Sequence, residues 1–219
     1  MISDAIWDNL RTPAGLTTDD DLFEWVENNY PKSEEHDFII ATDGSGCTEG
    51  WGAMCAIIET KYVGNKQVVM AATYGQTVQR CELQALLEGL YTASRIVADN
   101  FGGTVKEAVE SHAGQRFSVF WITDRSNLAK MLLTGEDDKP VCVLRTDNDL
   151  TMRLRYLMRF FNITPMHMPR NQDEDQKMCD AVCGVMRSHM KQIMKPALAI
   201  IQSIPIDQCQ KQPQSGLRF

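Results

Sequence analysis

The sequence contains no long hydrophobic run. No segment approaches the roughly 18 uninterrupted apolar residues that a membrane-spanning helix requires. Residues 1–10, MISDAIWDNL, carry acidic side chains where a secretory signal peptide has positive charge. These absences predict a protein that is neither membrane-spanning nor secreted, and we expect a cytoplasmic compartment.

The sequence also lacks a disulfide framework and a zinc motif. It has seven cysteines, an odd number, spread through apolar segments. Cys179 and Cys183 lie four residues apart in an expected helix, but no second pair and no nearby histidine completes a zinc site. We therefore predict buried free thiols.

Basic charge is scarce as well. Lys and Arg number 22 against 29 Asp and Glu, which gives a formal net charge of −7. Because phosphate contacts are made mainly by Lys and Arg, this balance argues mildly against a nucleic-acid partner. It does not exclude one, since bound divalent ions locally reverse the sign of a carboxylate cluster.

The length of 219 residues and the hydrophobic fraction of 43% predict one sizeable globular domain with extensions at both ends. Residues 1–36 form an acidic N-terminal extension with a short helix that ends before Pro31. Residues 37–195 form the expected domain, and residues 196–219 form a C-terminal tail.

Apolar patterns predict the order of secondary structure in the domain. Three successive strands, which indicate an antiparallel meander, are expected at 38–42, 51–60 and 67–75. Later strands are expected at 117–123 and 163–170, the latter at a sheet edge because it contains Pro165. Helices are expected at 78–100, 127–133, 149–161 and 176–194, with polar linkers at 102–115 and 135–147. This order predicts an α/β fold with a mixed sheet and helices on both faces.

Four carboxylates stand at strand ends and helix starts. Asp43 and Asp124 each close an expected strand, while Glu82 and Asp180 lie in the first turns of two expected helices. Each has apolar neighbours on both sides, so its charge is partly desolvated and needs a compensating cation. Taken singly, such an acid is more often a helix cap or a solvated end residue. The four together favour a site for Mg²⁺ or Mn²⁺, which prefer oxygen ligands.

Five motifs in series between residues 38 and 190 resemble the ribonuclease H family. They are TDGS followed by GWGA (42–45 and 50–53), RCELQA (80–85), ITD followed by SN (122–127), the helix that begins at Asp149, and MHMPR (166–170) with Asp180 beyond it. Each motif is weak alone, but all five occur in the family's order. The resemblance implies a ribonuclease H-like five-stranded mixed sheet, with three antiparallel strands followed by parallel ones.

The resemblance also implies a function. The protein would be a metal-dependent endonuclease, a hydrolase that cuts the RNA strand of RNA–DNA hybrids and leaves 3′-hydroxyl and 5′-phosphate ends. Two Mg²⁺ ions, with Mn²⁺ as a substitute, would activate water and stabilise the leaving oxygen. The implied metal ligands are Asp43, Glu82, Asp124 and Asp180.

Further residue roles follow from the same resemblance. His167 would lie on a mobile loop and assist proton transfer or product release; its alternative interpretation is a loop histidine packed near Pro169. The implied substrate contacts are Gly44, Ser45, Gln79, Ser126 and Asn127.

The chain departs from the family in its charges. Residues 136–147, EDDKPVCVLRTD, replace a lysine-rich protrusion, and no basic, tryptophan-bearing hybrid-binding module lies ahead of residue 37. Three acids precede Asp180: Asp173, Glu174 and Asp175. One of them is an additional metal ligand, or all three are solvated loop residues. Two groups of basic side chains lie at helical spacing, and each either grips the substrate or lines a solvated helix face. The first group is Arg153, Arg155 and Arg159, and the second is Arg187, Lys191 and Lys195. A protein partner that delivers the substrate through an end extension is a further hypothesis.

Two other functions stay open. One is a nuclease of the same fold that acts on DNA, and the other is a non-catalytic ribonuclease H-like module that binds nucleic acid or serves as a scaffold. The presence of all four carboxylates favours an enzyme, because function depends on the site and not on the fold.

Overall fold

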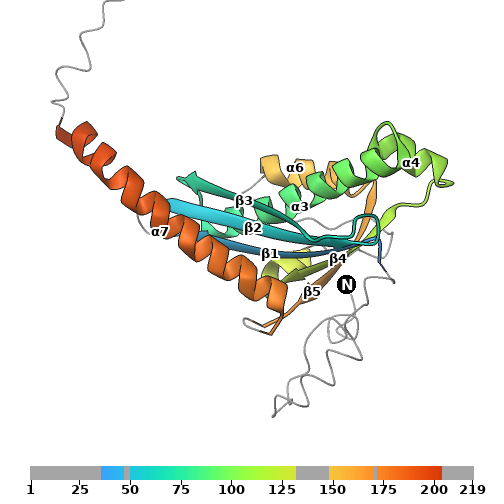
Figure 1. The fold of residues 1–219 in the computed structure, drawn as a ribbon, viewed down its shortest axis with the longest axis horizontal. Coiled ribbons are helices and arrows are strands. Elements are labelled where there is room, and N and C mark those ends of the chain that lie inside the picture. The colour runs from blue at the N-terminus through green and yellow to red at the C-terminus, as the bar shows by residue number, and fades with distance from the viewer. Residues whose placement is uncertain (1–35, 47–49, 132–147, 170–171, 204–219) are drawn as a thin grey trace, which may run out of the picture.

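The computed structural model describes residues 36–46, 50–131, 148–169 and 172–203. The elements in these ranges are β1 (Phe38–Gly46), β2 (Trp51–Thr60), β3 (Gln67–Tyr74), α3 (Val78–Phe101), α4 (Val105–Ser111), β4 (Phe117–Thr123), α5 (Ser126–Met131), α6 (Asn148–Leu157), β5 (Phe161–His167) and α7 (Glu174–Ser203). Figure 1 shows them along the chain.

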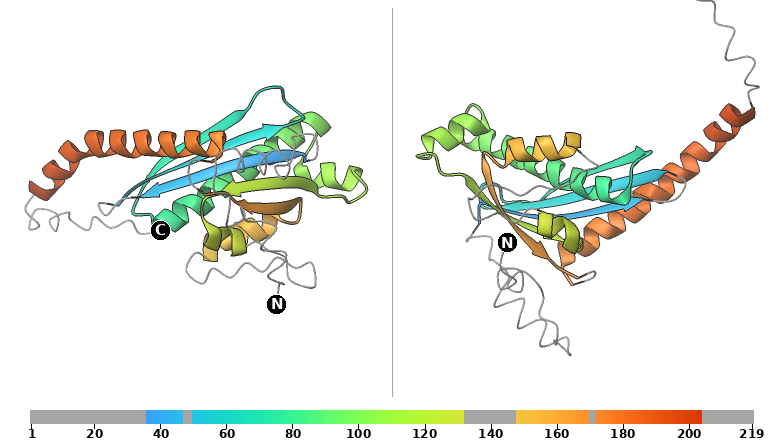
Figure 2. Two further views of the ribbon diagram at one scale, coloured as in Figure 1. Left: turned by 90° about the horizontal axis from the view of Figure 1, so that it is seen from below. Right: turned by 180° about the vertical axis from the view of Figure 1, so that it is seen from behind.

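The five strands form one mixed sheet in the order β3-β2-β1-β4-β5. β1, β2 and β3 pair antiparallel, and β4 and β5 extend the sheet in parallel from β1. Helix α3 packs on one face, with α6 against it, and α7 crosses the other face (Figures 1 and 2). The predicted mixed five-stranded sheet with helices on both faces is therefore confirmed, including the edge position of β5.

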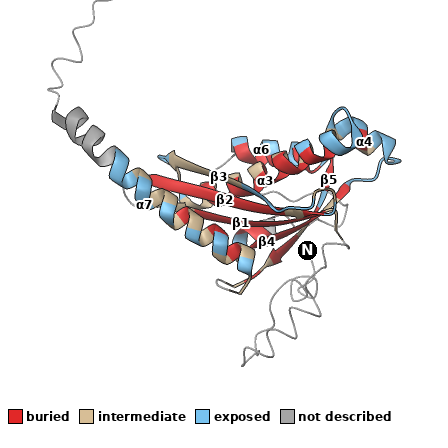
Figure 3. Ribbon diagram, in the orientation of Figure 1, coloured by how far each residue is buried: buried red, intermediate tan, exposed pale blue. Residues whose placement is uncertain are grey.

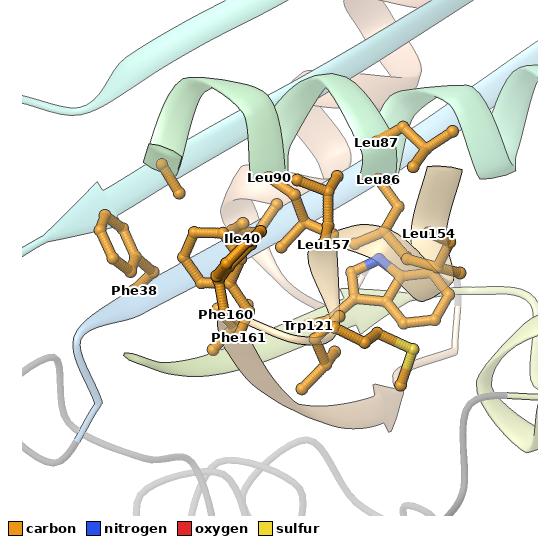
Figure 4. Packing of buried hydrophobic residues seen from close by; sticks show 14 of the residues in the cluster. Phe38, Ile40, Leu86, Leu87, Leu90, Trp121, Leu154, Leu157, Phe160 and Phe161 are labelled. Carbon is orange, nitrogen blue, oxygen red and sulfur yellow. The ribbon is translucent and has the colours of Figure 1, made fainter. Parts of the chain in front are cut away.

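The main core lies between the sheet and α3. Alternate residues of β1 point to opposite faces, so that Phe38 and Ile40 contact the α3 side and Ile39 and Ala41 the α7 side. Leucines of α3 and α6 project toward Phe38, Ile40 and the fully buried Trp121 (Figure 4). Strands β1, β2 and β4 are buried almost throughout, whereas the edge strand β3, α4 and the outward side of α7 are partly or fully exposed (Figure 3).

Several of the expected boundaries were wrong. The strand expected at 38–42 continues to Gly46, so Asp43 lies inside β1 and does not close it, and the strand expected at 163–170 spans Phe161–His167. The linker predicted at 102–115 contains helix α4, which begins with a capping box in which Thr104 and Glu107 satisfy each other's backbone N–H groups. The helix predicted at 149–161 ends at Leu157, and Phe161 is instead the first residue of β5, where it pairs with Phe117. Phe161 lies four residues after Leu157, a spacing that suits a helix, but burial against the sheet decides its conformation.

Helix α7 extends beyond the expected residue 194 to Ser203, so the boundary drawn between residues 195 and 196 falls inside a continuous helix. The expected N-terminal helix before Pro31, the linker 135–147 and the polar end of the tail lie outside the described residues. Cysteines in the described part are free and buried, as predicted: Cys55, Cys81, Cys179 and Cys183. Within that part, no helix combines the length and apolarity needed to cross a membrane.

Helix α3 approaches β1 most closely at Gly44. A Cβ atom added to Gly44 would lie 2.3 Å from the backbone nitrogen of Glu82, and backbone atoms cannot move aside as a flexible side chain can. Only glycine therefore allows α3 to bring Glu82 this close to the end of β1.

We predict that Gly44→Ala lowers the free energy of unfolding by about 3 kcal/mol, because the new methyl group forces α3 away from β1. Gly64→Ala is the matched control, since no heavy atom lies within 4 Å of its added Cβ. That change should stay within about 0.5 kcal/mol of the parent in urea unfolding. Equal effects of the two substitutions would contradict the packing argument.

Candidate metal centre

Asp43 and Asp124 are brought together by the register of the two central parallel strands. The last pair of β1 and β4 is Ala41 with Ile122, and each aspartate follows two residues later. Extending this register places Asp124 beside Asp43, at the end where parallel strands present their carboxyl termini. Asp43 is 2% exposed, and the Asp124 side chain is 14% exposed.

Buried contacts hold the backbone on either side of Asp43. The indole Nε1 of Trp121 donates to the Thr42 hydroxyl at 2.8 Å inside the α3-side core. From the opposite face, the Cys183 thiol of α7 donates to the Asp43 carbonyl at 3.4 Å. Asp43 is therefore fixed from both sides of the sheet, which limits how far its carboxylate can move.

Glu82 reaches the same place from the second turn of α3. The helix is capped by Thr77, whose hydroxyl accepts from the Arg80 backbone N–H at 3.1 Å. The Arg80 guanidinium binds both carboxylate oxygens of Asp149, at 2.8 and 2.5 Å, and so ties α3 to α6. Arg80 and Asp149, which both belong to the motifs of the sequence analysis, thus have a structural role close to Glu82.

The three carboxylates form one cluster. A carboxylate oxygen from each of Asp43, Glu82 and Asp124 lies within 4.8 Å of the other two. Burial raises the pKa of Glu82 well above its ordinary value, and the nearby charges of Asp43 and Asp124 raise it further. A hydrogen bond from Arg125 opposes this shift. The cluster is therefore unfavourable for three negative charges unless a cation is added.

The residues fit a divalent metal ion. Glu82 Oε1 accepts a hydrogen bond from Arg125, but Glu82 Oε2 is buried without a hydrogen-bond partner among the described residues. A buried carboxylate oxygen without a hydrogen-bond partner destabilises the fold, and coordination to a hard divalent cation removes this cost. Asp43, Glu82 and Asp124 are the side chains that would hold such an ion.

Asp180 and His167 lie on two other elements, α7 and β5. Asp180 lies on α7 beside Cys179, whose thiol donates to the Ala41 carbonyl of β1, but it is not among the three clustered carboxylates. Its role as a ligand stays a prediction. His167 is the last residue of β5, so its expected place on a loop is wrong; its Nε2 lies 3.1 Å from the Asp124 carbonyl oxygen.

The residues expected to contact substrate come from the same three segments as the carboxylates. Ser45 lies in β1 two residues after Asp43, Gln79 is in the first turn of α3, and Ser126 and Asn127 begin α5 after Asp124. All four are partly or fully exposed. Gly44 is buried against α3, so the structure gives it a packing role, and its contact with substrate stays a prediction.

Charged residues near the start of α7 have structural partners. Asp173 Oδ1 accepts from the Gln176 backbone N–H at 2.8 Å, and Asp175 binds Lys66 in the β2–β3 turn at 2.7 Å. Asp173 precedes α7, whereas Asp175 lies inside the helix and not in the expected loop. A metal-ligand role for these acids stays a prediction. Further along α7, Arg187 donates to the Ser45 hydroxyl and to the Gly46 carbonyl, which places one of the predicted basic residues at the end of β1.

Arg125 is a site residue that the sequence motifs did not identify. It follows Asp124 directly, where the pattern was matched only through Ser126 and Asn127. Its Nε donates to Glu82 Oε1 at 3.2 Å and lies 4.0 Å from Asp124 Oδ1. The position of Arg125 directly after an expected metal ligand was the only sequence feature that could have indicated its place in the site.

No protein-family model matches the chain, and no curated protein matches it in sequence. Solved structures resemble it. Ribonuclease H1 LC11, isolated from compost by a metagenomic approach, has a TM-score of 0.49 and 16% identity over 70% of this chain and 97% of that chain. Ribonuclease H1 from the halophilic archaeon Halobacterium salinarum NRC-1 has a TM-score of 0.44 and 17% identity over 67% and 94%. At such scores the likeness does not extend to activity.

We predict that the metal-free protein loses stability as the pH rises above 4.5, the ordinary pKa of a glutamate. Above that pH the unfolded Glu82 carboxyl releases its proton, while the folded one retains it because its pKa is raised, so that proton release favours unfolding. Glu82→Gln cannot titrate. In the presence of a chelator, the variant should therefore gain stability relative to the parent as the pH rises above 4.5, measured by urea unfolding. Parallel pH profiles would contradict the raised pKa.

Proposed function

We propose that this protein is a metal-dependent endonuclease that hydrolyses the RNA strand of RNA–DNA hybrids. The observation that carries the proposal is the convergence of Asp43, Glu82 and Asp124 within 4.8 Å at one end of the sheet. The ordered series of ribonuclease H-like motifs supports the substrate class. A purely structural cluster of three acids would lose stability with no compensating gain.

The carboxylates would hold two Mg²⁺ ions, or Mn²⁺ in their place, with Asp180 as a fourth ligand supplied by α7. When bound, the ions supply activation of water and stabilisation of the leaving oxygen. The chain's own part is to fix the ligands. The contacts of Thr42 and Cys183 hold Asp43, and the close packing at Gly44 holds Glu82. We expect 3′-hydroxyl and 5′-phosphate products.

His167 would carry a proton at the edge of this centre. The Asp124 carbonyl can only accept a hydrogen bond, so Nε2 of His167 is the donor in the 3.1 Å contact. A proton gained or lost by the ring is then on Nδ1. The same hydrogen bond orients the imidazole ring. The backbone of His167 is held by its pairing with Thr123 of β4 at the end of β5.

The partly exposed polar residues around the cluster would bind the hybrid. Ser45, Gln79, Ser126 and Asn127 present hydroxyl and amide groups suited to sugar and phosphate oxygens. An RNA strand is distinguished from DNA by its 2′-hydroxyl groups, which lie in a shallow minor groove. We therefore expect slight sequence preference.

The net charge of −7 makes a weak grip on nucleic acid the expected starting point. A protein partner that binds residues 1–36 or 196–219 would compensate for it. Removing both segments should then weaken hybrid cleavage in the presence of the partner; undiminished hybrid affinity after truncation would count against this role.

The proposal is tested by cleavage of a labelled RNA–DNA hybrid in Mg²⁺ or Mn²⁺, beside duplex RNA and duplex DNA. We predict cutting confined to the RNA strand of the hybrid, and a loss of at least about 100-fold in rate for Asp124→Asn, which removes a charged ligand. Asp99→Asn is the matched control, because Asp99 is an exposed acid at the far end of α3. It should retain the parent rate.

Other outcomes separate the competing functions. Cleavage of duplex or single-stranded DNA but not of the hybrid would assign the site to a DNA nuclease of the same fold. Hybrid binding without cleavage in either metal, by folded protein, would assign a non-catalytic module. Equal rates for Asp124→Asn and Asp99→Asn would place the chemistry elsewhere.

A further inference from the structure

Arg125 joins an exposed position to the most buried carboxylate of the cluster. Its side chain is 45% exposed, whereas Glu82 is 1% exposed. The Nε atom donates to Glu82 Oε1 at 3.2 Å and lies 4.0 Å from Asp124 Oδ1, so one guanidinium borders two of the three clustered acids. The Arg125 guanidinium therefore occupies a position in which it competes with a metal ion for Glu82 and Asp124.

The backbone of Arg125 is held independently of this contact. Its N–H donates to the Thr123 hydroxyl at 3.1 Å, and its carbonyl accepts from the N–H groups of Leu128 and Ala129 at the start of α5. The long side chain can therefore leave the cluster toward solvent without any movement of α5.

We propose that Arg125 is a displaceable counter-cation, which binds Glu82 beside Asp124 in the metal-free protein and must leave the cluster when a divalent ion binds. The inference rests on the proposed metal-dependent function and adds a regulatory feature to the same site. Two cations within a few ångströms repel each other strongly in a partly buried site, so the guanidinium and a metal ion compete for the carboxylates. Arg125 thereby raises the metal concentration that the protein needs.

Calorimetric titration of Mn²⁺ into chelator-stripped protein, without nucleic acid, measures this competition directly. We expect Arg125→Gln to bind Mn²⁺ roughly five- to tenfold more tightly than the parent, since the metal no longer has to break a partly exposed ion pair. Arg125→Lys keeps the charge and should stay within about twofold of the parent. Arg125→Met, which also removes the charge and keeps the length, provides a second neutral variant.

Arg153→Gln is the matched control. It removes the same charge from an exposed position on α6, an element that supplies none of the clustered acids. Its Mn²⁺ affinity should equal that of the parent, and circular dichroism of each variant verifies the fold. Tighter binding in Arg153→Gln as well would show a general effect of net charge and would overturn the specific role of Arg125.

Equal or weaker Mn²⁺ binding by both neutral variants at residue 125 would also overturn the inference. The Mn²⁺ result is independent of cleavage. If the parent cuts hybrids but the neutral variants bind Mn²⁺ no more tightly than the parent, only the role of Arg125 is refuted. Tighter binding by these variants in a protein that does not cut hybrids supports the inference and refutes the substrate assignment. An absence of Mn²⁺ binding in every variant would refute both.

Discussion

The electrostatic cost of holding three carboxylates within 4.8 Å of one another is the constraint on which the rest of the structure depends. Asp43 and Glu82 are almost completely buried, so water cannot screen their charges. Burial raises the pKa of Glu82, and the charges of Asp43 and Asp124 raise it further. A fold tolerates such a cluster only when its packing is strong enough to prevent the acids from separating and when a cation shares the site.

The packing meets this demand by acting on the neighbours of the ligands. Trp121 binds Thr42, the residue before Asp43, and Gly44, the residue after it, receives the backbone of α3. The parallel register of β1 and β4 then sets Asp124 at the same level. Each contact fixes a backbone position and leaves carboxylate oxygens available, which is the arrangement that a preformed ligand set requires.

Much of this architecture follows from local sequence patterns. The strands and the long helix α3 follow from apolar periodicity, and the clustered acids were predicted because each one ends a strand or begins a helix within apolar surroundings. Helix α4 was missed because the glycines and polar residues around it suggested a linker, although its capping box was present. The role of Arg125 is tertiary: its partner Glu82 lies 43 residues away, and no local pattern predicts which acid an arginine will reach.

The most direct test of the metal centre is the binding of Mn²⁺ to chelator-stripped protein, followed through the electron paramagnetic resonance signal of the free ion. The parent should bind Mn²⁺ saturably. Asp43→Asn should retain its fold and bind at least about tenfold more weakly, because it loses one of the charged ligands. Saturable binding of equal affinity in the parent and in Asp43→Asn would contradict a metal centre built on these carboxylates.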